Sequence, residues 1–331
     1  MTLQNRINEN LVRYMELIPG TSAFIDARTP GSDQKSNFCI IGAGVAESSR
    51  QHVHIRETAG FNIGAAGQPP GIKNSLHSHR TAELFIVFKG QFRFYWGNDG
   101  ENDVVLSSGD VISIPTNLFR GFEVVGSDYG FMYSVLGGDD SGGGVVWHPN
   151  VIKDSQGYGL YLKADGTLVD TIDGDPVPQE SELMPLLTKE QMEQFDRYTV
   201  EQMMAYVVLR KDYSSIENNK NPPNVKQYAL TGHPLADYDF QVKSEDEVSI
   251  IAYELSAGGV MVQERRDDKQ VLISFDGDTE VVVTYQGEKA SLILTRGDVF
   301  SVPEGASYAL TNLRGNSFIY CVLGSDKPEK L

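Results

Sequence analysis

Short apolar runs separated by turn sequences make up most of the chain, and this pattern predicts β-strands. Typical turn sequences are Gly97-Asn98-Asp99-Gly100 and Asp276-Gly277-Asp278. The opening segment differs, because apolar residues recur at helical spacing from Leu3 to Ile18 and Pro19-Gly20 then follow. We therefore expect a helix over this segment, ended by the Pro-Gly pair.

A second helix is predicted over residues 188–206. Thr188 and Gln191 have the spacing of a capping box, in which each side chain bonds the other residue's backbone N–H. The apolar side of this helix would consist of Met192, Phe195, Met203 and Tyr206.

Two stretches of the sequence occur twice in the same order. Residues 106–115 (LSSGDVISIP) return as 294–303 (LTRGDVFSVP), and residues 131–139 (FMYSVLGGD) return as 318–326 (FIYCVLGSD). Nearly the same offset relates two pairs of glycines, Gly71 with Gly258 and Gly90 with Gly277. This self-similarity predicts a duplicated β domain.

The duplication sets the expected domain organisation. We predict an all-β protein in which residues 35–150 and 225–331 each form a sandwich or closed barrel. Residues 1–34 would form an N-terminal helix and arm, and residues 151–224 would form connecting loops and a helix.

The composition of the chain argues against some classes of binding partner. The chain has 331 residues and a formal net charge of -17, so it lacks the basic character that nucleic acids and anionic membranes attract. No apolar run approaches the roughly 20 residues of a membrane span, and the N-terminus does not resemble a signal peptide. Cys39 and Cys321 are too far apart in sequence to suggest a disulfide framework. We expect a cytoplasmic protein with a small-molecule partner.

Three residues of the first repeat have the chemistry of metal ligands. His77 and His79 are two positions apart, so on a strand both side chains point to the same face. Glu83 follows after a short turn and could enter the same barrel. Two histidines and one carboxylate with open positions form the ligand set of non-haem Fe(II) oxygenases.

The spacing of these residues resembles the first sequence motif of the cupin superfamily. The matching positions are Gly71, His77, His79, Glu83 and Gly90. Gly109 and Pro115 likewise match the start of the second cupin motif. As a tandem repeat the chain resembles a bicupin, which implies two jelly-roll β-barrels with a few flanking helices. The resemblance supports His77, His79 and Glu83 as metal ligands.

The second motif departs from the cupin pattern at two positions. Cupins normally place a fourth ligand, a histidine, five residues after the proline, where this chain has Arg120, and Asn117 replaces the usual glycine. Arg120 could hold the carboxylate of a substrate at the metal, pair with Glu83 in the metal's place, or form a structural pair elsewhere. His52 and His54, another pair on a predicted strand, could supply the missing ligand.

The second repeat has lost the ligand set. The positions that correspond to His77, His79, Glu83 and Arg120 hold Glu264, Arg266, Gln270 and Tyr308. We expect no metal in the second barrel, whose role would be packing, dimerisation or closing one side of the first cavity.

Aromatic residues are concentrated around the predicted ligands. Phe85 and Phe122 could line a substrate pocket, although an ordinary role in the barrel core is the favoured interpretation of these aromatic residues.

These observations favour a metal-dependent bicupin enzyme, with Fe(II) dioxygenase chemistry on a small anionic substrate, for which aromatic acids are candidates. The layout resembles gentisate and hydroxynaphthoate dioxygenases, in which one barrel is competent and the other is empty. Arg120 would orient the anionic group, and a homodimer is expected. Two alternatives stay open: an isomerase or lyase that uses Mn, Ni or Zn on a sugar or small acid, and a metal-free binding or storage protein.

Overall fold

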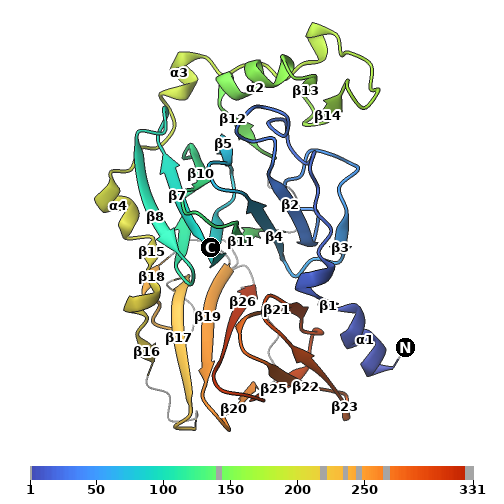
Figure 1. Ribbon diagram of the computed structural model, residues 1–331, viewed down its shortest axis with the longest axis vertical. Coiled ribbons are helices and arrows are strands. Elements are labelled where there is room, and N and C mark those ends of the chain that lie inside the picture. Colours follow the sequence, from blue (N-terminus) through green and yellow to red (C-terminus); the bar gives the residue numbers. More distant parts are fainter. Residues whose placement is uncertain are drawn as a thin grey trace, which may run out of the picture. The chain divides into compact units, whose positions relative to one another are not determined.

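The computed structural model describes residues 2–138, 144–216, 222–233, 238–243, 248–263 and 269–324. The chain divides into two compact units, each built around a β-barrel (Figure 1). One unit consists of Ile18–Val53 and Asn62–Val207, and the other of Met1–Leu17, His54–Phe61 and Val208–Leu331.

The amino-terminal barrel has two sheets in the described part of the chain. The larger sheet has the strand order β15-β9-β6-β11-β4-β2-β3 and the smaller one β12-β5-β10-β7-β8. The larger sheet contains β2 (Ser36–Ile41), β3 (Val53–Ile55), β4 (Phe61–Gln68), β6 (Glu83–Lys89), β9 (Val111–Ile114), β11 (Gly130–Gly137) and β15 (Val207–Val208). The smaller sheet contains β5 (Lys73–Ser78), β7 (Gln91–Trp96), β8 (Asn102–Ser107), β10 (Arg120–Val124) and β12 (Val146–Trp147).

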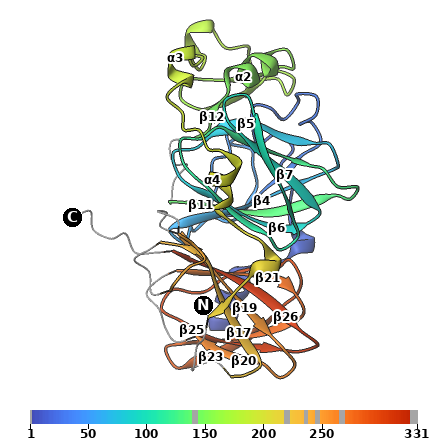
Figure 2. The ribbon, with the colours of Figure 1, turned by 90° about the vertical axis from the view of Figure 1, so that its left-hand side faces the viewer.

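The carboxy-terminal barrel repeats this plan. Its larger sheet has the order β1-β24-β21-β26-β19-β17-β16, with β18 parallel to β17, and its smaller sheet has the order β20-β25-β22-β23. Figure 2 shows β17, β19, β26 and β21 as consecutive strands. The larger sheet contains β1 (Leu11–Val12), β16 (Ser215–Ile216), β17 (Val225–Gly232), β18 (Val242–Lys243), β19 (Val248–Leu255), β21 (Gln270–Asp276), β24 (Val299–Ser301) and β26 (Ser317–Gly324). The smaller sheet contains β20 (Val260–Gln263), β22 (Thr279–Tyr285), β23 (Glu288–Leu294) and β25 (Ser307–Asn312).

The strand orders confirm the predicted duplication and the all-β fold. The order β9-β6-β11-β4-β2 in the first barrel corresponds strand for strand to β24-β21-β26-β19-β17 in the second. The order β5-β10-β7-β8 likewise corresponds to β20-β25-β22-β23. Two copies of one jelly-roll barrel therefore explain the internal repeat of the sequence.

The predicted opening helix is shorter than expected. Helix α1 (Leu3–Glu9) ends at Asn10, and Leu11–Val12 then form strand β1, which pairs with β24. The apolar side of α1, Leu3 and Ile7, belongs to the core of the carboxy-terminal barrel. The extended conformation of β1 prevails because it covers the otherwise open edge of β24.

The helix predicted over residues 188–206 is two short helices. The capping box of Thr188 and Gln191 is present and begins α3 (Lys189–Met192). A second capping box, from Thr199 to Gln202, begins α4 (Val200–Met204). The segment between them leaves the helical path because its backbone bonds elsewhere: the amide of Asp196 donates to the carbonyl of Asn117.

The remaining elements lie mainly in the segment that follows the first barrel. They are α2 (Pro149–Gln156), β13 (Leu160–Leu162), β14 (Leu168–Asp170) and the 3-10 turns Tyr14–Glu16, Glu180–Glu182 and Arg210–Asp212. Leu160 and Leu162 pack with Ile25, Ala27 and Trp147 in a separate apolar cluster. None of the described helices is long and apolar enough to span a membrane.

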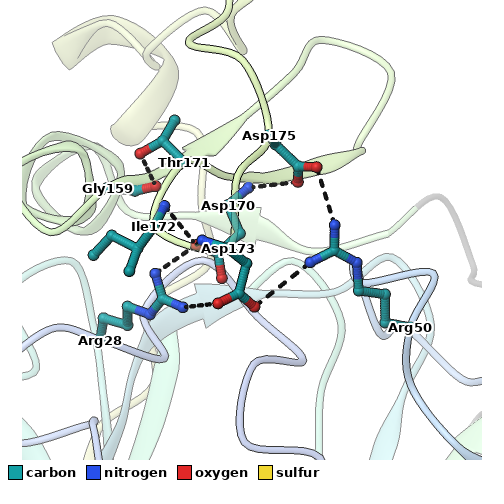
Figure 3. Close-up of polar contacts among 8 residues, drawn as sticks. All are labelled: Arg28, Arg50, Gly159, Asp170, Thr171, Ile172, Asp173 and Asp175. Carbon is teal, nitrogen blue, oxygen red and sulfur yellow. Dashed lines mark hydrogen bonds and ion pairs between the residues drawn. The ribbon is translucent and has the colours of Figure 1, made fainter.

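Ion pairs fasten the β13–β14 hairpin to the loop that precedes β2 and to the loop that follows it (Figure 3). Arg28 donates to Asp170 and to Asp173, and Arg50 pairs with Asp173 and Asp175. Asp170 also accepts hydrogen bonds from the backbone amides of residues 172 and 173. Each of the three aspartates pairs with at least one of the two arginines, so we interpret this cluster as a structural link between the hairpin and the two loops.

Candidate metal centre

Strand pairing brings the predicted ligands together. His77 is near the end of β5, Glu83 begins β6, and Arg120 begins β10. In the antiparallel pair of β10 with β5, Arg120 lies directly opposite His77. The fold thus converts three distant sequence positions into one constellation inside the first barrel.

His77, His79 and Glu83 present a compact set of ligand atoms. One ligand atom from each side chain lies within 4.8 Å of the others, and all three residues are buried. Nε2 of His79 is 3.7 Å from Oε2 of Glu83. Among the residues that the structure describes, this is the group of histidine, cysteine and acidic side chains that could hold an ion.

Both imidazoles are prepared for ligation through Nε2. Nδ1 of His77 is 2.7 Å from the carbonyl oxygen of Ser75, and Nδ1 of His79 is 3.4 Å from that of Gly144. A carbonyl accepts, so the proton is assigned to Nδ1, which leaves the Nε2 lone pair available. Burial and the nearby Arg120 cation hold the pKa of each histidine well below its usual range, so both rings are neutral, as metal ligation requires.

Arg120 occupies the position at which cupins supply a fourth ligand, and here it pairs with Glu83. Its Nη2 donates to Oε2 of Glu83 over 2.8 Å, and its Nη1 donates to the carbonyl of His77 over 3.3 Å. Burial raises the pKa of Glu83, and the Arg120 cation opposes this rise. Nε of Arg120 is buried without a hydrogen-bond partner. Two of the five guanidinium N–H groups are thus used in these bonds, and the N–H of Nε is one that is left for a further acceptor.

The residues fit a divalent transition metal. Two neutral imidazoles and one carboxylate, whose ligand atoms lie within 4.8 Å of one another, are the donor set of sites with two histidines and one carboxylate. Because Arg120 contacts one oxygen of Glu83, an ion would share this carboxylate with the guanidinium or displace it. His52 and His54 are outside the group of ligand atoms, so neither takes the place of the missing histidine in this arrangement.

A cavity of about 70 Å³ opens beside the ligands. His77, His79 and Glu83 form one part of its wall, and Phe85 and Phe122 another. The rest of the lining is mainly apolar and small: Ala23, Ala43, Ala65, Ala66, Gly42, Gly44, Gly64 and Cys39 contribute to it. The ring centroids of Phe85 and Phe122 are 5.5 Å apart and the ring planes are inclined by 65°, so these residues both line the cavity and pack against each other.

A surface hollow reaches the same site from outside the barrel. It is lined by His79, Arg80, Asn117, Gln194 and Phe195, among others, and has a volume of about 330 Å³. His79 contributes to the lining of both the hollow and the cavity, so one of the three candidate ligands lies between them.

Two residues that the sequence did not indicate complete the surroundings of His77. Trp147 lies opposite His77 in the pair of β12 with β5, and the two rings are 5.2 Å apart. Nε1 of Trp147 donates to Oε1 of the half-buried Glu47 over 2.5 Å. Neither Trp147 nor Glu47 belongs to a recognisable sequence motif, and both are far from His77 in sequence, so the sequence did not indicate that they lie near it.

The corresponding positions of the second barrel hold a neutral pair. The hydroxyl of Tyr308 donates to Oε1 of Gln270 over 3.0 Å, in the interior of the barrel. Glu264 and Arg266, which correspond to His77 and His79, lie outside the described residues. The described part of this barrel contains no group of three potential ligands.

Comparisons with known proteins agree with this architecture. The model of the cupin domain family matches residues 67–136, which contain the ligand set. Among solved structures, the oxalate decarboxylase of Lactobacillus farciminis in complex with formate superposes with a TM-score of 0.59 at 11% identity, covering 95% of this chain and 86% of that one. The Bacillus subtilis oxalate decarboxylase, for which Mn(II) centres are described, gives 0.58 at 12% identity over 96% of this chain and 77% of that one. No curated protein matches the sequence significantly.

Proposed function

Since this chain is a bicupin of the cupin superfamily, we propose that it is a metal-dependent enzyme acting on a small carboxylic acid in its amino-terminal barrel. The observation that carries the proposal is the buried set of His77, His79 and Glu83, whose ligand atoms lie within 4.8 Å beside a cavity. A bound divalent ion would polarise a substrate oxygen as a Lewis acid.

Arg120 is the residue that selects an anionic substrate. A guanidinium donates two parallel hydrogen bonds to a carboxylate, and this geometry favours carboxylates over neutral groups. Once Glu83 ligates an ion, its charge is shared with the metal, and Arg120 can turn its donors toward a substrate carboxylate. The orphaned Nε of Arg120 supplies one of these donors.

The small apolar cavity determines how large the substrate can be. Phe85 and Phe122 cover one side of the cavity, and His77, His79 and Glu83 form its polar end. Arg120 is bonded to Glu83 at this polar end. A compact acid with few polar groups besides its carboxylate suits this lining.

Two reaction classes follow from this site. The first is Fe(II)-dependent dioxygenation, which the ligand set of two histidines and one carboxylate favours. The second is carbon–carbon cleavage with Mn(II), which is favoured by the small cavity and by the similarity in fold to oxalate decarboxylases.

Metal loading followed by turnover assays tests the proposal. Protein loaded anaerobically with Fe(II) or Mn(II) is expected to retain one ion, and H77A/H79A is expected to retain none. His52→Ala, at an exposed histidine of the same domain, is the matched control and should load like the wild type.

Turnover then separates the two reaction classes. Oxygen uptake with hydroxylated aromatic acids identifies the dioxygenase, and CO2 release from oxalate or other small diacids identifies the lyase. If the wild-type protein retains no ion under any loading condition, the metal-dependent function is contradicted and only the assignment of the fold remains.

A further inference from the structure

We propose that the buried ion pair of Asp26 and Lys35 is a positioning device that fixes the His77 imidazole for metal binding. This inference rests on the proposed role of His77 as a ligand. Neither Asp26 nor Lys35 is among the residues that line the cavity, so both act through the strand that carries His77.

The first step of the connection is the hydrogen bond that orients the ring. Nδ1 of His77 donates to the carbonyl of Ser75 over 2.7 Å, two residues earlier on β5. A metal-bound histidine needs a fixed acceptor at its other nitrogen, because this contact sets both the tautomer and the ring plane. The position of the Ser75 backbone therefore determines where Nε2 of His77 points.

The second step is the attachment of Ser75 to Asp26. The amide of Ser75 donates to Oδ2 of Asp26 over 3.1 Å, and the hydroxyl of Ser75 is 3.2 Å from that of Ser32. Asp26 is fully buried and lies far from Ser75 in sequence. A carboxylate outside the barrel strands thus holds the backbone of β5 immediately before His77.

The third step is the role of Lys35. Its ammonium donates to Oδ1 of Asp26 and, over 2.6 Å, to the side-chain oxygen of Asn74. Asn74 is itself held by the hydroxyl of Tyr95, which donates to its carbonyl over 2.8 Å. Lys35 therefore clamps two consecutive residues of β5, one directly and one through Asp26.

Energetics support a positioning role for this pair. Removing two charges from water costs several kcal/mol per ion, so a buried ion pair adds little or nothing to stability compared with apolar residues of similar size. Lys35 is only 2% exposed and Asp26 is completely buried. The gain from such a pair lies in directional bonds, and here these bonds end on the strand that carries a ligand.

A different contact restricts the face of the ring. The indole of Trp147 packs on the His77 ring at 5.2 Å between centroids, and its Nε1 is bonded to Glu47. The Asp26–Lys35 pair fixes the ring edge through Ser75, whereas Trp147 restricts the ring face. Loss of the ion pair should therefore alter ligand geometry without opening the barrel.

The test compares two buried carboxylates of the same domain. Asp26→Asn removes the charge that holds Lys35 and Ser75, whereas Asp170→Asn is the matched control, because Asp170 also accepts from a cationic side chain and from backbone amides (Figure 3). The affinity for Co(II) and the visible spectrum of the Co(II)-loaded protein are measured for both variants and the wild type.

We expect Asp26→Asn to bind Co(II) roughly 10- to 100-fold more weakly, with shifted absorption bands, while Asp170→Asn binds like the wild type. If Asp26→Asn does not fold, the apolar double variant D26L/K35M replaces it, with the same expected loss of affinity. An affinity within about twofold of the wild type and an unchanged spectrum in the folded variant overturn the proposal.

A second readout separates this inference from the proposed function. If the wild type retains no metal, the proposed function fails, and the histidine tautomers of the metal-free protein are measured by nitrogen-15 NMR. The proposal then requires protonation of His77 at Nδ1 in the wild type and a mixture of tautomers in Asp26→Asn. The same single tautomer in both proteins overturns it.

Discussion

Arg120 donates a hydrogen bond to Glu83 over 2.8 Å in the interior of the first barrel, where both side chains are buried. The second barrel has the same relationship in neutral form, with Tyr308 donating to Gln270 over 3.0 Å. Corresponding strand positions thus face one another in both copies. The duplicated fold brings these two positions together in each barrel, and the residue types at the positions determine whether the hydrogen bond between them is charged or neutral.

We predict that Arg120→Met strengthens metal binding and destabilises the metal-free protein. Loss of the guanidinium removes a cation next to the ion and frees Glu83, but it leaves a buried carboxylate unpaired when no metal is present. The metal-free protein should lose about 3–5 kcal/mol of stability, and added Mn(II) should restore much of this loss. Thermal unfolding with and without Mn(II) measures both effects. Weaker Mn(II) binding by Arg120→Met than by the wild type would contradict the proposed competition.

We predict one metal ion per chain. The first barrel holds the ligand set, whereas Gln270 and Tyr308 satisfy each other at the corresponding positions of the second barrel. Elemental analysis of loaded protein should give a metal-to-chain ratio near one, and this ratio should fall to near zero in H77A/H79A. A ratio near two, or one ion left in the double variant, would place a metal elsewhere.

We predict that Tyr308→Phe destabilises the second barrel without changing metal content. The substitution leaves Oε1 of Gln270 buried without its hydroxyl donor, which costs about 1–3 kcal/mol. Urea denaturation measures the loss, and Tyr285→Phe, at a partly buried tyrosine of the same domain, is the control. Equal stability of Tyr308→Phe and the wild type would show that this hydrogen bond is not needed.

We predict that Glu47 makes the stability of the protein depend on pH. Burial raises the pKa of Glu47 to about 8, although hydrogen bonds from Trp147 and from the amide of Ile25 favour its ionised form. The unfolded chain releases this proton near pH 4.3, so the folded state binds more protons between these values. The stability that this group contributes is therefore complete below about pH 4.3 and is lost as the pH rises toward 8.

Urea unfolding between pH 5 and 8.5 checks this expectation. The stability of the wild type relative to Glu47→Gln should decrease as the pH rises. Glu193→Gln, at an exposed glutamate of the same domain, should not change the profile. Parallel profiles for the wild type and Glu47→Gln would show that Glu47 does not titrate in this range.

We predict that the two glycines of the cupin motif differ in their tolerance of alanine. Gly71 and Gly90 both have positive φ, 77° and 83°, which costs an alanine roughly 1–2 kcal/mol. A Cβ on Gly90 would also lie 2.9 Å from Cα of Gly130, whereas a Cβ on Gly71 would meet no atom within 4 Å. Gly90→Ala should therefore lower the melting temperature more than Gly71→Ala, and the reverse order would contradict this reasoning.

The sequence predicted the duplication because two stretches recur in the same order, and it predicted the grouping of His77, His79 and Glu83 from their close spacing. The two-residue period of β-structure suggested that His77 and His79 point the same way. The structure places His79 directly after the end of β5 and still groups it with His77 and Glu83. The partner of Arg120 could not be predicted, because it depends on the register between β10 and β5, which are far apart in sequence. Tertiary contacts alone connect His77 with Asp26, Lys35 and Glu47, and local sequence patterns do not predict such contacts.

The helices were harder to delimit for a related reason. The apolar spacing from Leu3 to Ile18 suits a helix, but Leu11 and Val12 also suit an edge strand, and pairing with β24 decided the outcome. Phe195 fitted the apolar side of a continuous helix, yet its ring packs on Phe119 at 4.3 Å between two separate helices. Tertiary contacts outweighed helix periodicity in both places.

The short strand β1 also bears on how the protein can be produced and handled. Leu11 and Val12 shield β24, and Arg13 binds Asp298 just beyond it, so shortening the chain by its first dozen residues would bare a strand edge. An exposed strand edge can pair with strands of other molecules, so the shortened protein would tend to aggregate during purification. Affinity tags are better added ahead of an intact amino terminus than substituted for it.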